Sequence, residues 1–482
     1  MLTYLYDSLY GFRKVFSRHR MWLIFVMIVL GFIGCNEMTG VSSFCRFWLM
    51  DNQGYYKLLG LFRSSAWELK GLLEYWFVFV VHQQQSISSQ GRLVTLGDHT
   101  YVPKEGRRMP GVVTLRQDSE TQSKPSYFRG QCWGGLALAV GSMTTPFSLP
   151  LNLRLHQGSI HLGEARESSL TLGEQMVQMA IDFAFQTNQG VVLVLDAFFS
   201  VGPVFLLAQA TKLTSIKAPA VHIITKAKKN YVAYLQADPS HYTGIGRPCE
   251  YGEHIHLMEV FDHLYLFQKA SVRIYGHMEE IYIFHLDLLW KSTQGPLRFV
   301  FAKTSRGPIV LMCSNLDQDP IAAIELYCLR TRIETMFDML KNVLHIFQCH
   351  FWSKKMPKHS RKPKSNKNQQ APQAENAKTV QTCWDATERF VNLGAISLGL
   401  LQLIALKFPE EIWSRFEGFL RTRSRDIPSE RTVKMVIANL LVQDFLKVAP
   451  KGTMREIRAN ILKGRFKKKL FQAEDPVNQR AA

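Results

Sequence analysis

The sequence predicts an α/β protein in which a mixed β-sheet is flanked by helical regions at both ends. Three observations predict this class. Val191–Leu195 is a continuous apolar run that stops at Asp196, which is typical of a central strand covered on both faces. Several strand-like segments follow between residues 227 and 314. Apolar residues at helical spacing dominate residues 1–88 and the chain after residue 379.

Composition indicates a globular protein with a polyanionic partner. Hydrophobic residues make up 46% of the 482 residues and charged residues 20%. Lys and Arg number 58 against 39 acids, a formal net charge of +19, which favours nucleic acid or an anionic membrane surface. The eight cysteines are scattered without a Cys-x2-Cys pair, which argues against a zinc ribbon or a disulfide framework and favours reduced thiols in a cytosol.

The segment Met21–Gly34 is strongly apolar, follows several basic residues and precedes Cys35. It therefore resembles a signal peptide or a lipoprotein cleavage site. The run is short for a bilayer, and apolar residues also precede it, so we expect a buried helix in a helical N-terminal domain, residues 1–88. A lipoprotein anchored at Cys35 is the alternative, and fractionation of the expressed protein separates the two. The helical domain is either a DNA-binding bundle or a cap without DNA contacts.

The middle of the chain predicts the sheet. Asp98 closes the first apolar strand, and Asp196 closes a later one. Thr171 and Glu174 form a candidate capping box for the helix between them. The expected order is strand, strand, strand, helix, strand, helix, strand, at residues 92–98, 132–140, 147–157, 171–185, 191–195, 204–211 and 220–225.

A helix is expected over Asp319–Lys341, with Asp319 as its N-cap and Pro320 in the first turn. Its predicted apolar face consists of Ile321, Leu329, Ile333, Met336, Leu340 and Leu344. Its other face presents Tyr327, Arg330, Glu334 and Lys341. A carboxylate between two cations suits a metal site beside a phosphate backbone. The same pattern also suits ordinary ion pairing on a solvated helix face.

The spacing Tyr-x2-Arg-x3-Glu-x6-Lys, met by Tyr327, Arg330, Glu334 and Lys341, resembles the YREK signature of DDE transposases from bacterial insertion sequences. The predicted element order is similar to that of the ribonuclease-H-like fold of this family. The resemblance covers roughly residues 90–350 and implies a ribonuclease-H-like catalytic domain (89–226 and 315–350) interrupted by a β-rich insertion domain (227–314).

This resemblance also implies a function and a set of site residues. It implies a DNA transposase that cleaves and transfers strands, with Asp98, Asp196 and Glu334 as catalytic acids holding two Mg²⁺ ions, for which Mn²⁺ can substitute. Among other acids, Asp118 lies in a polar loop, Asp182 lies mid-helix and Asp338 lies near the Glu334 face. The DNA-binding residues it implies are Tyr327, Arg330, Lys341, Lys226, Lys228 and Lys229.

The expected partners are double-stranded DNA, as transposon ends and target, and a second copy of the chain in a homodimer on DNA. We expect no membrane and no small-molecule substrate, and a location in the bacterial cytoplasm at the nucleoid. A non-catalytic DNA-binding relative that retains the fold is the alternative. Trp290 is a candidate to stack on a flipped base, although a Trp in a β-domain is more often a core residue.

The last part of the chain divides into two regions. Residues 351–378 are rich in Lys, Arg and polar residues and predict a flexible basic linker. Residues 379–482 predict a helical C-terminal region, with helices at 382–406 and 429–448 and a basic helix at 451–470.

Overall fold

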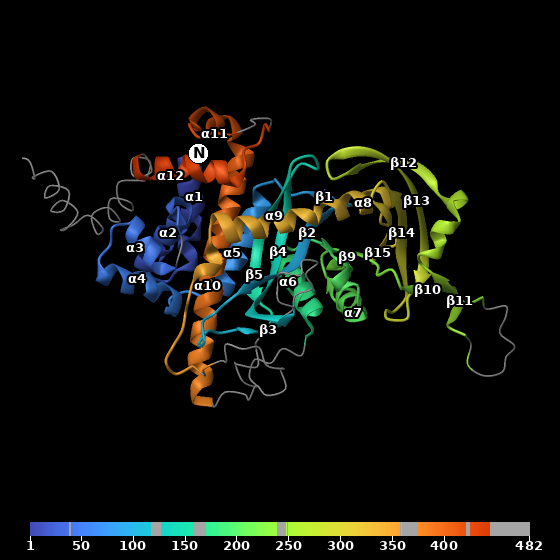
Figure 1. The fold of residues 1–482 in the computed structure, drawn as a ribbon, viewed down its shortest axis with the longest axis horizontal. Coiled ribbons are helices and arrows are strands. Elements are labelled where there is room, and N and C mark those ends of the chain that lie inside the picture. The colour runs from blue at the N-terminus through green and yellow to red at the C-terminus, as the bar shows by residue number, and fades with distance from the viewer. Residues whose placement is uncertain are drawn as a thin grey trace, which may run out of the picture.

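The computed structural model describes residues 1–37, 40–116, 127–157, 170–238, 247, 249–356, 358, 374–420 and 425–443. It is a mixed α/β protein, with one large mixed sheet and helices at both ends of the chain (Figure 1). This agrees with the predicted class.

The N-terminal region is helical, as predicted. Its helices are α1 (Leu2–Gly11), α2 (His19–Gly34), α3 (Val41–Phe47), α4 (Asn52–Arg63) and α5 (Leu69–His82). The apolar segment forms α2, in which every residue from Trp22 to Gly34 is buried. The indole of Trp76 on α5 is fully buried and donates to the Pro150 carbonyl at 2.9 Å. The bundle is thereby fixed to the edge of the sheet.

The central strand of the sheet is β2 (Arg92–Pro103). It runs parallel to β6 (Val191–Leu195), which in turn runs parallel to β9 (Val221–Lys226). On its other side β2 pairs antiparallel with β4 (Tyr127–Gly141). The remaining elements here are β1 (Ser88–Ser89), β3 (Val113–Arg116), β5 (Pro146–Leu155), α6 (Leu172–Thr187), α7 (Gly202–Ala210) and the small pair β7 (Lys212–Leu213) and β8 (Ala218–Pro219). The predicted order of three strands, helix, strand, helix, strand is present as β2, β4, β5, α6, β6, α7 and β9, with β3 as an added strand.

The strands of the predicted insertion continue the same sheet. They are β10 (Val232–Gln236), β11 (Tyr251–His256), β12 (Gln268–Ile274), β13 (His277–Leu289), β14 (Pro296–Thr304) and β15 (Gly307–Cys313). Leu311 of β15 pairs with Lys226 of β9, so these strands join the central ones in one 13-stranded sheet over the described residues (Figure 1). One of the strand-like segments between 227 and 314, residues 263–268, instead contains a 3-10 turn, Leu264–Leu266, in which no residue is buried.

The C-terminal helix α10 (Ala374–Lys407) runs between the N-terminal bundle and β5 (Figure 1). The amide of Asn392 on α10 exchanges two hydrogen bonds with the backbone of Leu153 on β5. Helices α11 (Pro409–Arg415) and α12 (Glu430–Gln443) follow. Within the described residues α10 alone is long and apolar enough to cross a membrane, but 89% of its most apolar window is buried in the protein, as in a core helix.

Much of the predicted basic linker, residues 357 and 359–373, and the predicted basic helix at 451–470 lie outside the described residues. At the start of the linker, Phe351 and Met356 are buried. Its last residues, 374–378, belong to α10. The linker predicted from composition therefore includes buried residues at its start and helical residues at its end.

The helix expected over Asp319–Lys341 is divided into α8 (Pro320–Leu329), α9 (Thr331–Asp338) and a π-helical turn (Met339–Val343). It begins as predicted, because the Asp319 carboxylate accepts from the Ala322 amide at 2.7 Å and Pro320 occupies the first turn. Of the predicted apolar face, Leu329, Ile333, Met336, Leu340 and Leu344 are buried. Ile321 is the exception at 36% exposed, since it lies in the first turn.

The N-cap gives a first prediction. Asp319→Ala removes an acceptor for an unsatisfied first-turn amide, and we expect it to lower the free energy of unfolding by about 1 kcal/mol. Urea denaturation measures the change. Asp317→Ala is the matched control, since the Asp317 side chain is exposed and caps no helix. Equal stability of the two variants would contradict a capping role.

Candidate active site

The first two predicted acids lie side by side on adjacent parallel strands. Leu93–Leu96 of β2 pairs residue by residue with Val191–Val194 of β6. The same register, continued two residues beyond its last pair, places Asp98 opposite Asp196. The sheet therefore brings together two carboxylates that are far apart in the sequence.

Asp98 was predicted to end its strand, and this prediction is wrong. β2 continues to Pro103 because β4 pairs with it along this whole length, including Asp98 with Gly135. Burial and the nearby carboxylate of Asp196 raise the pKa of Asp98 to about 7, although the His99 amide and Arg330 favour the charged form. A buried carboxyl with a raised pKa at the end of a parallel strand pair is typical of a functional site.

Asp196 follows the last residue of β6, as predicted. Its carboxylate accepts from the Phe198 amide at 2.9 Å, which fixes the turn after the strand. The hydroxyl of Thr225, on the adjacent strand β9, donates to the Asp196 carbonyl at 2.6 Å. Burial raises the pKa of Asp196, against the lowering effects of the Phe198 amide and Arg330.

Arg330 joins the acids of the sheet to the third acid on α9. One terminal nitrogen of its guanidinium lies 3.3 Å from Asp98 Oδ2, and the other donates to Glu334 Oε1 at 2.7 Å. Burial disfavours the charge on Arg330, but Asp98, Tyr327, Glu334 and Asp196 together outweigh this and raise its pKa. Arg330 was predicted to bind phosphate; in this structure it neutralises a cluster of three carboxylates.

Helix α9 approaches the sheet closely because of Gly135. A Cβ at this position would lie 2.7 Å from the ring of Phe337. Gly135 pairs with Asp98 in the antiparallel register of β2 and β4. The absence of a side chain at Gly135 therefore lets Phe337 of α9 pack against β4 at the residue that pairs with Asp98.

Two further predicted DNA-binding residues, Tyr327 and Lys341, have different surroundings. Tyr327 is near Arg330 and Asp196, and burial raises its pKa to about 12. Lys341 was expected on the same helix face, but it lies in the π-helical turn and its ammonium donates to the Tyr101 carbonyl of β2 at 3.3 Å. It is thus held beside the sheet, with Asp338 rather than Glu334 as the nearby acid.

The three lysines after β9 begin at the edge that carries Asp196. Lys226 is the last residue of β9, directly after Thr225. Lys228 and Lys229 are exposed, and the Lys228 ammonium lies 5.8 Å from the centre of the Tyr231 ring. Trp290, the candidate for base stacking, is buried against Tyr231 and Phe205, so the structure places it in the core.

The three carboxylates have the donor chemistry that a hard divalent cation requires. Carboxylate oxygens suit Mg²⁺. Burial is the main cause that raises the pKa of Asp98 and of Asp196, and the charge of Asp196 adds to it at Asp98. Within the described residues no three His, Cys, Asp or Glu side chains surround a single point, and the guanidinium of Arg330 lies between Asp98 and Glu334. The carboxylate groups are therefore suitable ligands for such a cation, provided that the Arg330 side chain moves from between Asp98 and Glu334.

Two neighbouring features were not predicted from the sequence. Thr225, which holds the Asp196 carbonyl, looks like any other strand residue. His99 points to the face of β2 opposite Asp98, where it stacks on Phe199 with ring centres 5.1 Å apart and hydrogen-bonds His156 at 2.8 Å. Burial lowers the pKa of His99 to about 4, so the pair is neutral at pH 7. The one sequence signal for His99 was its position directly after the candidate acid Asp98.

No model of a known protein family matches the chain, and no curated protein sequence is significantly similar to it. The geometry around Asp98, Asp196 and Glu334 therefore carries the functional argument.

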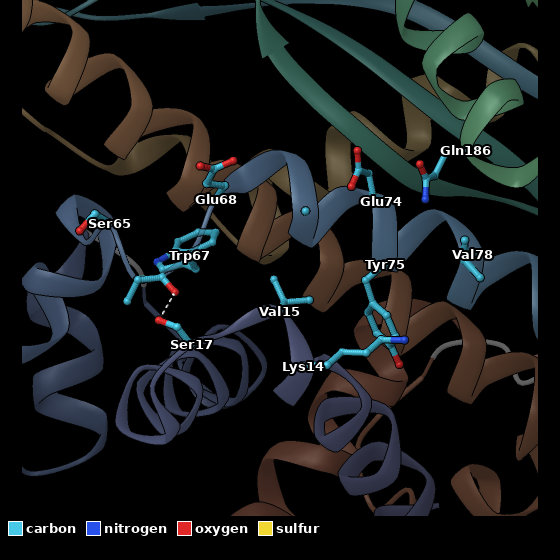
Figure 2. A pocket seen from close by; sticks show the side chains of 12 residues that line it. Lys14, Val15, Ser17, Ser65, Trp67, Glu68, Glu74, Tyr75, Val78 and Gln186 are labelled. Carbon is cyan, nitrogen blue, oxygen red and sulfur yellow. Dashed lines mark hydrogen bonds between the residues drawn. The ribbon is translucent and has the colours of Figure 1, made fainter.

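A cavity lies away from these acids, between the 3-10 turn Phe12–Val15, the segment before α5 and α5 itself. It measures about 580 Å³ and is lined by residues that include Lys14, Glu68, Glu74 and Tyr75 (Figure 2). The Lys14 ammonium lies 4.7 Å from the centre of the Tyr75 ring, and the Ser17 hydroxyl donates to the Ala66 carbonyl. We place the candidate active site at the sheet, where Asp98 and Glu334 both contact Arg330.

Proposed function

We propose that this protein is a DNA transposase of the DDE type, which binds the ends of its insertion sequence and cleaves and transfers DNA strands. The observation that carries the proposal is the convergence of Asp98, Asp196 and Glu334 around Arg330 from three separate parts of the chain. The predicted order of strands and helices, the YREK spacing and the net charge of +19 support the same proposal. The ribonuclease-H-like fold and the β-rich insertion domain are part of this proposal.

The chemistry follows from the residues. Asp98, Asp196 and Glu334 would hold the metal, and two bound Mg²⁺ ions would activate the entering oxygen and stabilise the leaving one. The two terminal nitrogens of Arg330 contact two different carboxylates, and in the proposed complex they would instead bind two oxygens of the scissile phosphate, a group that a guanidinium can hold in a bidentate manner. Tyr327 packs beside Arg330, and Lys341 offers a further cation next to β2.

The cleavage test uses the full chain, Mg²⁺ and a supercoiled plasmid that carries the DNA flanking this gene. We expect nicking at the element borders, with Mn²⁺ as a working substitute and none in EDTA. Binding should weaken steeply as salt rises, because each phosphate neutralised releases counterions. The measurements are gel analysis of the plasmid and binding at several salt concentrations.

The outcome separates the two candidate functions. Binding without nicking, in either metal ion, would reject the transposase and leave a non-catalytic DNA-binding protein. Absence of both binding and nicking would reject both.

A further inference from the structure

Two adjoining cavities lie at the far end of β2 from the insertion strands. One, about 450 Å³, is lined by Arg107, Arg108, Trp352 and Lys358, among others. The other, about 480 Å³, is lined by Pro103, Phe128 and Arg129, among others. Gly106 and Arg107 line both, so the two form one surface, which we call the 103–109 groove.

The groove is a built structure. The ammonium of Lys104 is buried and donates to the carbonyls of Phe347 and Cys349. Arg108 donates to the Lys354 carbonyl at 2.7 Å. These bonds fasten the loop after β2 to the segment that precedes α10. The two walls are therefore joined to each other by hydrogen bonds.

The groove combines positive charge with an exposed aromatic ring. Arg107, Arg108, Arg129 and Lys358 line it together with the buried Lys104, and among the described lining residues Glu105 is the single acid. Trp352 is 53% exposed, although Phe351 and Met356 of the same segment are only 4% and 3% exposed. An indole left in solvent among guanidinium and ammonium groups is the combination that binds nucleic acid, with cations on phosphates and the ring against a base.

From this combination we infer that the 103–109 groove is a second DNA-binding site, which holds the strand leaving the active site and stacks an unpaired base on Trp352. The inference rests on the proposed function, because it takes DNA as the substrate at Asp98. Pro103 lies five residues beyond Asp98 along β2, which at the usual strand rise is about 17 Å. That length corresponds to about five base pairs of duplex. Lys341, bonded to Tyr101, lies between the acids and the groove.

The experiment measures binding rather than cleavage. The full chain with Asp196→Asn is titrated into two short fluorescein-labelled duplexes, one blunt and one with a single-stranded 3′ overhang. We expect Trp352→Ala to weaken binding to the overhang by about tenfold and to leave the blunt duplex almost unchanged, while Trp352→Phe restores most of the affinity. The double variant Arg107→Glu, Lys358→Glu should reduce the slope of log affinity against log salt by about two on both DNAs.

Two matched variants control for the loss of an exposed ring and of an exposed cation. Phe419→Ala removes a ring that is 91% exposed, and Lys212→Glu reverses an exposed charge beyond α7. Neither should change affinity or salt slope. Unchanged overhang binding in Trp352→Ala together with an unchanged slope in the double variant would overturn the inference, even if the unaltered protein nicks DNA. The expected changes in a protein that never nicks would support the groove while rejecting the transposase.

Discussion

Asp196→Asn is expected to abolish DNA nicking, with a loss on the order of 10³-fold or more, while binding to the same DNA persists. The reason is electrostatic: the substitution removes one charged ligand from the place where negative charge develops on the reacting oxygens. The asparagine can still accept the Phe198 amide hydrogen bond, so the turn after β6 keeps its shape. Plasmid nicking assays and binding measured by fluorescence anisotropy test the two halves of this expectation.

The chain offers a matched control on the helix of the third acid. Asp338 lies four residues after Glu334 on α9, and its carboxylate accepts from Asn342 at 2.6 Å. Glu334→Gln should lose activity as Asp196→Asn does, whereas Asp338→Asn should nick DNA within a few-fold of the unaltered protein. A comparable loss in Asp338→Asn would show that the wrong acid of this helix has been assigned.

Asp98→Asn is expected to stabilise the metal-free protein while abolishing nicking. Burial and the charge of Asp196 raise the pKa of Asp98 from 3.8 to about 7. An acid whose pKa is higher when folded holds its proton longer in the folded state, so stability falls as pH rises. The penalty is absent below about pH 4, grows between pH 4 and 7 and is complete above pH 7. A shift of this size corresponds to roughly 4 kcal/mol.

Urea denaturation in EDTA at pH 5 and pH 8 measures this effect. We expect the unaltered protein to lose stability between the two pH values and Asp98→Asn to lose much less, so that the variant gains most at pH 8. Saturating Mg²⁺ should stabilise the unaltered protein at pH 8 and leave the variant unchanged, since binding to the folded state adds to the free energy of unfolding. If the free energy of unfolding changed with pH equally in the two proteins, the raised pKa of Asp98 would be contradicted.

Much of this fold could be predicted from local patterns. The apolar run Val191–Leu195, the capping box Thr171–Glu174 and the cap at Asp319 act over a few residues, and each appears where it was expected. The apolar helix α2 was also recognisable, because it is too short for a bilayer and is covered on all sides.

The candidate site was harder to predict where it depends on contacts between distant residues. Nothing local indicates that β4 extends the pairing of β2 past Asp98, or that Gly135 admits Phe337. The spacing around Glu334 indicated a shared helix face, but the π-helical turn at Met339–Val343 carries Lys341 to Tyr101 instead. The ion pairs of Arg330 arise because β2, which carries Asp98, and α9, which carries Glu334, meet there.

Helix α10 determines when the sheet becomes covered during synthesis of the chain. The strand β5 is covered by a helix that begins more than 200 residues later in the chain, and Asn392 closes the contact with Leu153. A nascent chain on the ribosome therefore leaves this face of β5 uncovered until α10 has emerged. The sheet cannot be fully packed before the chain has been synthesised beyond Lys407.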